Sequence, residues 1–306
     1  MARVNESRLD EPQLRLSRPA RIFGILSLII LCVITIFPIY WMLRTALSTT
    51  RLLFENPTDL LPSHFTWGGF ARVLGLASDQ QAIAEGGSGA SINFGQAFLN
   101  SVIVSTVITL CQVAFSAAAA YAFSVLKWRG RDTVFFVFVV SLTVPGIFLL
   151  IPNYLFMRDL GLINTLFGIM LPQLLMSPFA IFFLRQFFLG TNLSIVEAAI
   201  IDGASHFKIF WRIVAPLALP QIVTLGILQF IASWNDYLWP FYIGSGDPSS
   251  TVLTVALGVF KSQTPQGSPD WAGLMAGALI AALPMVLLMI FFGRRIVGSI
   301  QASGVK

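Results

Sequence analysis

Six long stretches without a charged residue dominate this 306-residue sequence, at 22–43, 92–126, 134–157, 160–184, 213–235 and 271–293. A helix rises about 1.5 Å per residue, so each stretch can cross the roughly 30 Å hydrocarbon core of a bilayer. Hydrophobic residues make up 56% of the chain and charged residues only 11%, which is far from the balance of a soluble domain. The sequence therefore predicts an all-α, polytopic membrane protein with six transmembrane helices.

Two apolar stretches differ in length from a single membrane crossing. The stretch at 92–126 is longer than a crossing needs and starts with the polar sequence INFGQAFLN, so we expect an interfacial turn followed by a span over 98–125. A further uncharged piece at 248–260 is too short to cross and is expected to lie in the membrane interface. The expected number of spans therefore stays at six.

The distribution of Lys and Arg predicts which side each loop faces, because these residues accumulate on the cytoplasmic side. With the N-terminus inside, 14 of the 19 Lys and Arg residues fall in inner segments, and the outer ones are Arg44, Arg51, Arg72, Arg158 and Lys261. Both termini are therefore expected in the cytoplasm, and the net charge of +5 reflects topology rather than a nucleic-acid surface. A cleaved signal peptide is the alternative for the N-terminus, but the first apolar run ends in FPIYWMLR instead of a small-residue cleavage site.

The longest expected outer segment, 45–91, separates the first two spans. Its first half carries turn residues and aromatic residues in PTDLLPSHFTWGGF, and its second half, at 77–91, contains EGGSGAS. Gly- and Ser-rich composition of this kind is typical of a flexible insertion. No separate soluble domain is expected here.

The sequence argues against an enzyme or an ion-driven pump that works without a partner chain. An embedded enzyme or an ion-driven pump normally places ionisable groups in the membrane, and the predicted spans are almost empty of them. His64 and His206 lie far apart without other ligands at metal spacing, so no metal site is expected. No Gly is followed by Lys, so the chain has no phosphate-cradling P-loop. If ATP provides energy, another chain must hydrolyse it.

One acidic residue lies at the edge of a predicted span. Asp236 falls near the outer end of the fifth stretch, beside Trp234 and Asn235 in the sequence SWNDYLWPFY. Aromatic residues at such a position are typical of a membrane-interface belt. The alternative that the sequence leaves open is that Trp234, Asn235 and Asp236 line an outer gate or the substrate pathway.

The sequence EAAIIDGASHF, at 197–207, interrupts the apolar pattern on the inner side. In the overlapping SIVE, Ser194 and Glu197 have the spacing of a capping box, which predicts the start of a short helix. Gly203 is placed to end that helix in the left-handed conformation, and Ser205 to cap a second helix.

The composition of these two helices predicts different surroundings. The first carries the small residues Ala198 and Ala199 and the acidic residues Glu197 and Asp202, which suits a knob inserted into a groove on a cytoplasmic partner. In the second, apolar residues recur at helical spacing, so we expect this helix to lie along the inner leaflet. They are Phe207, Phe210, Trp211 and Val214.

These residues carry a resemblance to a known family. EAAIIDGASHFKIFWRIVAPLALP resembles the EAA signature of permease subunits in binding-protein-dependent ABC importers. NYLFMRDLGLINT, FFLRQFF, LQFIASWNDYLWP and the tail RRIVGSIQASGVK are similar to the carbohydrate-importer branch, most of all to the second permease of maltose-type transporters. The resemblance covers the chain from Ile25 onward, and the insertion at 77–91 departs from it.

The resemblance implies a division of labour among several chains in the bilayer of the bacterial inner membrane. This chain and a sister permease would form the pathway, an external binding protein would deliver a sugar, and two ATPase subunits would hold ATP and Mg²⁺. The first short helix would sit in a cleft on the ATPase, and its coupling residues would be Glu197, Ala198, Ala199, Asp202 and Gly203. The chain itself would bind no cofactor and no nucleic acid.

The expected organisation is a cytoplasmic segment at 1–21, a permease domain at 22–296 with the coupling segment at 194–216, and a cytoplasmic tail at 297–306. Two other classes are weighed against it. A secondary transporter would need coupling-ion ligands in the membrane or an inverted repeat, and an embedded enzyme would need a catalytic constellation; the sequence shows neither. The substrate stays open among disaccharides, oligosaccharides, amino sugars and glycerol-phosphate-type solutes.

Overall fold

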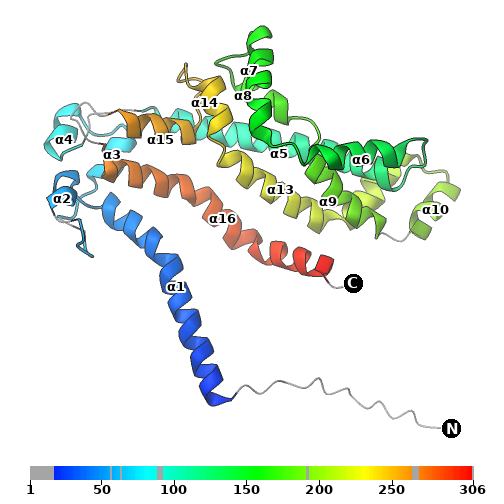
Figure 1. Ribbon diagram of the computed structural model, residues 1–306, viewed down its shortest axis with the longest axis horizontal. Coiled ribbons are helices and arrows are strands. Elements are labelled where there is room, and N and C mark those ends of the chain that lie inside the picture. The colour runs from blue at the N-terminus through cyan, green and yellow to red at the C-terminus, as the bar shows by residue number, and fades with distance from the viewer. Residues whose placement is uncertain are drawn as a thin grey trace.

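The computed structural model describes residues 17–55, 57–62, 64–87, 92–190, 193–263 and 269–304, and within these ranges the chain is helical and contains no strand. The elements are labelled as in Figure 1. They are α1 (Arg18–Ala46), α2 (Thr50–Glu55), α3 (Gly68–Val73), α4 (Asp79–Ala84), α5 (Phe94–Ser124), α6 (Arg131–Ser141), η1 (Gly146–Leu149), α7 (Leu150–Asp159), α8 (Leu166–Met170), η2 (Leu171–Gln173), α9 (Pro178–Leu189), α10 (Leu193–Ile201), α11 (His206–Ile209), η3 (Phe210–Val214), α12 (Ala215–Leu217), α13 (Leu219–Trp234), α14 (Leu238–Gly244), α15 (Leu253–Ser262) and α16 (Trp271–Gly304).

Three helices are long and apolar enough to cross a membrane unbroken: α1, α5 and the Trp271–Gly293 part of α16. The other three apolar stretches form pairs of helices, with bends of 94° between α6 and η1–α7, 45° between α8–η2 and α9, and 80° between α11–α12 and α13. The described residues thus provide up to six spans if each bent pair counts as one. The lengths of the apolar stretches alone did not predict these interruptions.

Proline explains each interruption. Pro145 has an extended backbone, with φ −62° and ψ 128°, between α6 and η1. Ser177 is extended at φ −98° and ψ 135° because the ring of Pro178 disfavours a helical conformation in the residue before it. Ala218 leaves the helix with ψ 12°, two residues before Pro220, which lacks the N–H that would continue the bonding pattern.

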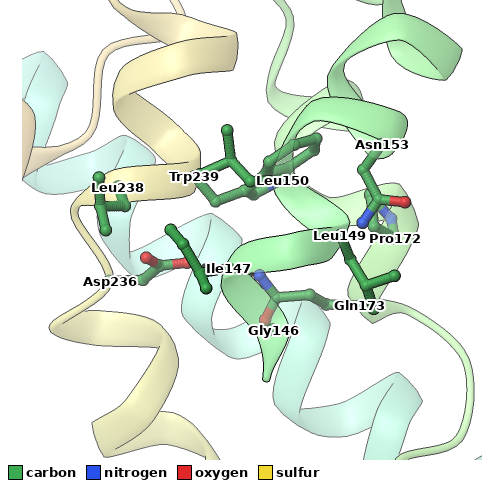
Figure 2. Close-up of a pocket in the computed structure, with 10 residues that line it drawn as sticks. All are labelled: Gly146, Ile147, Leu149, Leu150, Asn153, Pro172, Gln173, Asp236, Leu238 and Trp239. Carbon is green, nitrogen blue, oxygen red and sulfur yellow. Dashed lines mark hydrogen bonds between the residues drawn. The ribbon is translucent and has the colours of Figure 1, made fainter. Parts of the chain in front are cut away.

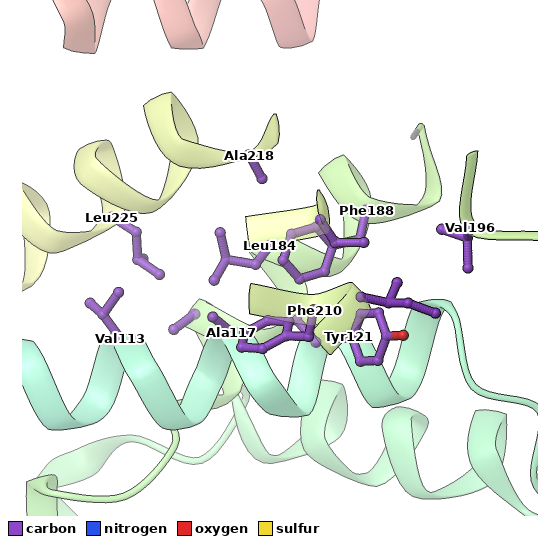
Figure 3. Packing of buried hydrophobic residues seen from close by; sticks show 13 residues of the cluster. Val113, Ala117, Tyr121, Leu184, Phe188, Val196, Phe210, Ala218 and Leu225 are labelled. Carbon is purple, nitrogen blue, oxygen red and sulfur yellow. The ribbon is translucent and has the colours of Figure 1, made fainter. Parts of the chain in front are cut away.

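The central helix is α5, which packs against α6, α8, α9, α13 and α15 (Figure 1). Three hydrophobic clusters follow along its length: the first contains Phe94, the second Ile108 and the third Tyr121. Figure 3 shows the third cluster, where Leu184 of α9 and Phe210 of η3 lie against α5. Because one helix contributes to all three clusters, it fixes the positions of the interrupted spans relative to one another.

The helix α1 stands apart from this bundle. Its last residues, Arg44, Thr45 and Ala46, are buried, whereas its apolar residues from Ile22 to Leu43 are mostly exposed. Figure 1 shows α1 meeting α16 near one end and leaning away toward the other. The end of the molecule that holds α2 to α4 is called the outer end below, and the end that holds α10 and α11 the inner end.

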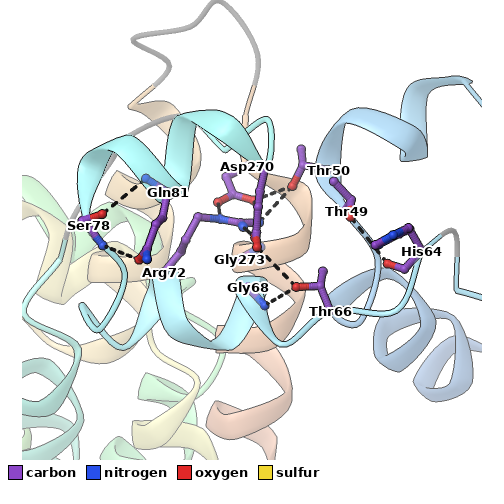
Figure 4. Close-up of polar contacts among 11 residues, drawn as sticks. Thr49, Thr50, His64, Thr66, Gly68, Arg72, Ser78, Gln81, Asp270 and Gly273 are labelled. Atoms are coloured by element: carbon purple, nitrogen blue, oxygen red, sulfur yellow. Dashed lines mark hydrogen bonds and ion pairs between the residues drawn. The ribbon is translucent and has the colours of Figure 1, made fainter.

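A buried polar cluster ties the outer end together (Figure 4). This outer cluster consists of Thr50, Arg72, Glu85 and Asp270. The Nη2 of Arg72 donates to Asp270 Oδ1 and to Thr50 Oγ1 at 3.0 Å each, while its Nε and Nη1 pair with Asp270 and Glu85. Asp270 also accepts a bond from the Gly273 N–H at 2.9 Å and so caps the start of α16. All three guanidinium nitrogens of Arg72 thus have acceptors, which offsets the cost of removing this charge and that of Asp270 from water.

The insertion at 77–91 is folded where the structure describes it, so the expectation of a flexible segment is wrong for 77–87. Ser78 and Gln81 form a reciprocal capping box at the start of α4. Gly87 donates its N–H to Ala82 O at 2.8 Å and packs beside the side chain of Arg72. Residues 88–91 lie outside the described residues.

Candidate functional site

The EAA-like sequence folds into a short helix followed by a tight turn at the inner end. Gly203 has φ 78°; its N–H bonds Ile200 O at 3.0 Å, and the Ala204 N–H bonds Ala199 O at 2.9 Å. These two bonds form a Schellman motif with Gly203 at the left-handed position. The left-handed conformation predicted for Gly203 is therefore confirmed, and it sets the direction in which the chain leaves α10.

The start of α10 differs from the prediction. The helix begins at Leu193, so Ser194 lies inside the first turn instead of preceding it as an N-cap. The positions before it, 191–192, lie outside the described residues. Helix ends are defined to within one or two residues, which is the scale of this difference. The helix is about 13 Å long, as its nine residues require.

Most of α10 faces away from the rest of the chain. Val196 is 3% exposed and belongs to the third cluster, so it anchors the helix (Figure 3). Ile201, in contrast, is 85% exposed, and Ala199 is half-buried. The other exposed residues of this helix and its turn include Ile195, Glu197, Ala198, Ile200, Asp202 and Gly203. A helix fixed along one edge thus presents an acidic residue, small residues and isoleucines on its free surface.

The second helix starts as predicted but presents two faces. The Ser205 hydroxyl accepts from the Lys208 N–H at 3.4 Å and caps α11. Phe207 is 75% exposed, whereas Val214 at its far end is fully buried. The turn at Phe210–Val214 is a π-helix, which holds more residues per turn and shifts the register of the side chains. The single apolar face expected for this helix is therefore divided between the core and the surface.

Tyr121, near the C-terminal end of α5, connects the bundle to this second helix. Its hydroxyl lies 3.1 Å from Nδ1 of His206. Its ring packs on Phe210 with centroids 5.4 Å apart. The polar and the aromatic contact together join α5 to both α11 and η3.

Arg185 of α9 makes a second connection at the inner end. Its Nε donates to Phe123 O at 3.0 Å and its Nη2 to Asp132 Oδ1 at 3.2 Å. The guanidinium also lies 4.0 Å from the ring centroid of Phe135, close enough for a cation–π interaction. One side chain thus joins α5, α6 and α9 at the inner end.

The second candidate site is a pocket of about 480 Å³ where the three interrupted spans meet (Figure 2). Asn153 of α7, Gln173 of η2 and Asp236 after α13 are its polar side chains. Asp236 Oδ2 accepts a hydrogen bond from Gln173 Nε2 at 3.5 Å. The apolar lining consists of Gly146, Ile147, Leu149, Leu150, Pro172, Leu238 and Trp239.

The structure separates the three adjacent residues that the sequence grouped as a belt or gate. Trp234 is buried between Phe98 and Phe230, and its Nε1 donates to Ala281 O at 3.1 Å, so it is a core residue rather than part of an interface belt. Asn235 is exposed and bonds Ile231 O at 2.8 Å within its own helix. Only Asp236 lines the pocket.

The sequence reasoning missed Asn153 and Gln173. Neither residue belongs to a recognisable motif, and both lie inside stretches that look uniformly apolar. The available signal was the proline next to each of them, because proline is disfavoured in a helix interior: Pro152 lies in the first turn of α7 and Pro172 in the short helix η2. In the part of the chain that the structure describes, His, Cys, Asp and Glu form no group of three or more that could hold a metal ion.

The fold and these two sites define a class: a helical membrane transport subunit with interrupted spans around a polar pocket. A sequence profile of the family described as binding-protein-dependent transport system inner membrane component matches residues 112–301. The chain belongs to this family, and it is a permease subunit of an ABC importer.

Curated relatives extend over most of the chain. The arabinooligosaccharides transport system permease protein AraQ of Halalkalibacterium halodurans is 35% identical over 209 residues, 68% of this chain and 73% of the relative. The diacetylchitobiose uptake system permease protein NgcG of Streptomyces coelicolor is 29% identical over 275 residues, 90% and 85% of the two chains. The sn-glycerol-3-phosphate transport system permease protein UgpE of Yersinia pestis is 29% identical over 276 residues, 89% and 93%.

A solved structure has the same fold. It is a crystal structure of a bacterial ABC transporter involved in the import of the acidic polysaccharide alginate, and the superposition gives a TM-score of 0.73 with 91% of this chain and 98% of that chain covered. The sequence identity is 23%, so this similarity concerns the fold alone.

Proposed function

We propose that this chain forms half of the import pathway for a sugar or sugar derivative, with a sister permease forming the other half and an external binding protein delivering the solute. Two ATPase subunits on the inner side would bind ATP and Mg²⁺ and supply the energy. Relatives named for arabinooligosaccharides and for diacetylchitobiose support the carbohydrate assignment. A relative named for sn-glycerol 3-phosphate supports the alternative substrate class.

The single observation that carries the coupling part of this proposal is the form of α10. It is fixed to the bundle through buried Val196, ends in a rigid Schellman turn at Gly203, and exposes Glu197 and Ala198. A stiff element with a free acidic and apolar surface can transmit a push from a partner, whereas a flexible loop would absorb it. We assign Glu197, Ala198 and Ala199 to contact with the ATPase.

Asp202 and Gly203 have a different part in this proposal, because they shape the turn rather than the contact surface.

Both termini are proposed to be cytoplasmic, which the Lys and Arg distribution supports. A cysteine placed at exposed Ser205 would then resist a thiol reagent added from outside. Labelling of that cysteine in sealed, right-side-out vesicles would show that the chain has the opposite orientation.

A secondary, ion-coupled transporter subunit, the other transporter class weighed from the sequence, is set aside because the chain belongs to a family of ABC importer permeases. Co-purification tests the partnership directly, because an ABC permease brings an ATPase with it and an ion-coupled transporter does not.

The test of the proposed function is Glu197→Ala in the assembled importer. Truncating one partner of a desolvated charge pair at an interface typically costs about 2–5 kcal/mol, so attachment of the ATPase should weaken strongly. The measurements are pull-down of the ATPase and the ratio of solute imported to ATP hydrolysed in reconstituted membranes. Glu55→Ala is the matched control, since Glu55 is exposed at the outer end and pairs with exposed Arg51 at 3.9 Å.

Two results would contradict the proposal. Normal attachment and normal coupling in Glu197→Ala would remove α10 from the interface with the ATPase. An equal loss in Glu55→Ala would show that any charge removal disturbs the complex, so that the effect at position 197 would carry no information about coupling.

A further inference from the structure

The proposed function does not say which solutes the pocket of Figure 2 accepts. We propose that this chain binds the solute itself, in this pocket, and that the pocket selects uncharged polyhydroxylated solutes over anionic ones. Asp236, Gln173 and Asn153 are the residues that would bind the hydroxyl groups. The inference rests on the proposed function and deepens it, since it names the substrate class.

The pocket lies where interrupted helices meet. One wall comes from η1 and the start of α7, another from η2 before the bend to α9, and the third from the link between α13 and α14. Backbone groups released at such breaks are tolerated at membrane depth where they line a cavity. Discontinuous helices in transporters commonly place substrate sites in this way. The position of the pocket is therefore that of a site on the pathway.

The polar groups match the needs of hydroxyl groups, which both donate and accept hydrogen bonds. The Asp236 carboxylate accepts, and the amides of Gln173 and Asn153 each donate and accept. The side chains of Asp236 and Gln173 lie together, joined by their hydrogen bond, and Asn153 lies apart from them, so a solute could bond to this pair and to Asn153 (Figure 2). The apolar lining suits the C–H surface of a sugar ring, and about 480 Å³ lies within the usual range of roughly 300–1,000 Å³ for ligand pockets.

Charge decides between the solute classes. Among the described residues that line the pocket there is no Lys, Arg or His, and the charged one is the carboxylate of Asp236. A phosphate or carboxylate group in this pocket would face a like charge, with no positively charged side chain in the described lining to offset it. An uncharged solute avoids this repulsion and can use the carboxylate as a strong acceptor.

The polar groups are held in place by neighbouring elements. The carbonyl of Gln173 accepts from Gln112 Nε2 at 2.9 Å, so α5 fixes η2. The carbonyl of Asp236 accepts from Thr254 Oγ1 at 2.7 Å, so α15 fixes the link after α13. Trp239 donates its Nε1 to Ile169 O at 2.9 Å. The site is thus preorganised, which reduces the ordering cost of binding.

The test measures equilibrium binding of three radiolabelled probes to the purified permease–ATPase complex without the binding protein: an arabinooligosaccharide, diacetylchitobiose and sn-glycerol 3-phosphate. We expect at least one uncharged sugar to bind and the glycerol phosphate to bind much more weakly. Asp236→Ala should raise the dissociation constant of that sugar roughly 10- to 100-fold, because a hydrogen bond to a charged group is lost. Gln173→Ala should raise it less, since a neutral group is lost.

Asp159→Asn and Gln173→Arg complete the design. Asp159 is exposed, pairs with Arg158 at 2.8 Å and does not line the pocket, so its replacement should leave the dissociation constant unchanged. Gln173→Arg adds a positive charge beside Asp236 and should improve binding of the glycerol phosphate relative to the sugar. The pocket variants should retain normal ATPase attachment, which distinguishes their effect from a failure of the proposed coupling.

Three results would overturn the inference. Binding of glycerol phosphate as tight as that of the sugars would remove the selection against anions. Normal sugar binding in both single variants, Asp236→Ala and Gln173→Ala, would show that the sugar does not bind in this pocket. Absence of binding of all three probes to the complex would show that this chain does not hold the solute, even where the complete importer transports one of them.

Discussion

The outer and inner ends of this chain are built by opposite means. The outer end joins distant segments through buried charges: Arg72 and Asp270, which are 198 residues apart, are 2% and 1% exposed. The inner end joins its segments through apolar contacts, the hydrogen bond between Tyr121 and His206, and an ion pair of Arg185 with the exposed Asp132, and it leaves Glu197 and Ile201 exposed on α10. The outer end thus satisfies buried charges within the chain, whereas the inner end leaves an acidic and apolar surface of α10 uncovered, as the proposed contact with an ATPase requires.

The comparison has a mechanical consequence. An outer end held by a hydrogen-bonded ion pair resists separation of α3 from α16, because separating the pair would leave charges buried without partners. An inner end fixed along one edge of α10 can move as a unit when a partner pulls on it. Substitutions at the outer end should therefore affect the stability of the whole chain, and substitutions at the inner end should affect coupling.

The largest effect is expected for Arg72→Ala. Removing one partner leaves the Asp270 carboxylate buried without its main counter-charge, which typically costs about 3–5 kcal/mol. The amount of intact chain in the membrane and its thermal midpoint in detergent should both fall sharply. The double variant Arg72→Met with Asp270→Asn should recover much of this loss, because Asn retains the oxygen that caps α16 and the charge that loses its partner, Glu85, is 35% exposed.

If Arg72→Ala were as stable as the unchanged protein, the outer cluster would contribute nothing to stability. The comparison between the two ends would then fail. A double variant no better than the single one would place the loss in the hydrogen bonds of the guanidinium rather than in the unpaired charge, since Met keeps most of the apolar stem.

The second effect is expected at Gly203 and should be confined to the inner end. No atom lies within 4 Å of an added Cβ, so the penalty for a side chain comes from φ 78° alone. Gly203→Val should strain the turn by about 1–2 kcal/mol and redirect α10, because β-branched residues resist the left-handed conformation. The ratio of solute imported to ATP hydrolysed should fall while the thermal midpoint changes little.

Gly203→Asn is the matched control, because Asn adopts the left-handed conformation more readily than other residues with a side chain. It should couple better than Gly203→Val. Equal coupling in the two variants would mean that the backbone conformation at this turn is not what matters.

Local rules predicted much of the inner end from the sequence. The turn at Gly203 and the cap at Ser205 depend on residues that are neighbours in the chain, and both are present. The apolar stretches predicted a helical membrane protein for the same reason, since each span reports its own length and composition. The coupling role of Glu197, Ala198, Ala199 and Asp202 stays a prediction.

Features that depend on distant residues were not predictable in this way. The sequence places Arg72 and Asp270 in loops, and nothing local indicates that they meet. Trp234 looked like an interface residue because it lies at the end of a span, but the aromatic residues that cover it come from α5 as well as from its own helix. The pocket depends on two proline-linked breaks meeting the link between α13 and α14, which requires the arrangement of several helices.

The smallest effect, and the sharpest test of how the two ends differ, is expected for Tyr121→Phe. The substitution removes the hydrogen bond to His206 at 3.1 Å but keeps the ring that packs on Phe210, so it should cost about 1 kcal/mol. Amide hydrogen exchange in α11 should then accelerate roughly fivefold, because local opening becomes easier by that amount. The Gly273 amide, which bonds Asp270 at the outer end, should exchange at an unchanged rate. Tyr242→Phe on an exposed tyrosine serves as the control and should alter neither rate. Faster exchange at both ends would show that the chain opens as one cooperative unit, and the distinction between a self-sufficient outer end and an inner end that responds to a partner would have to be abandoned.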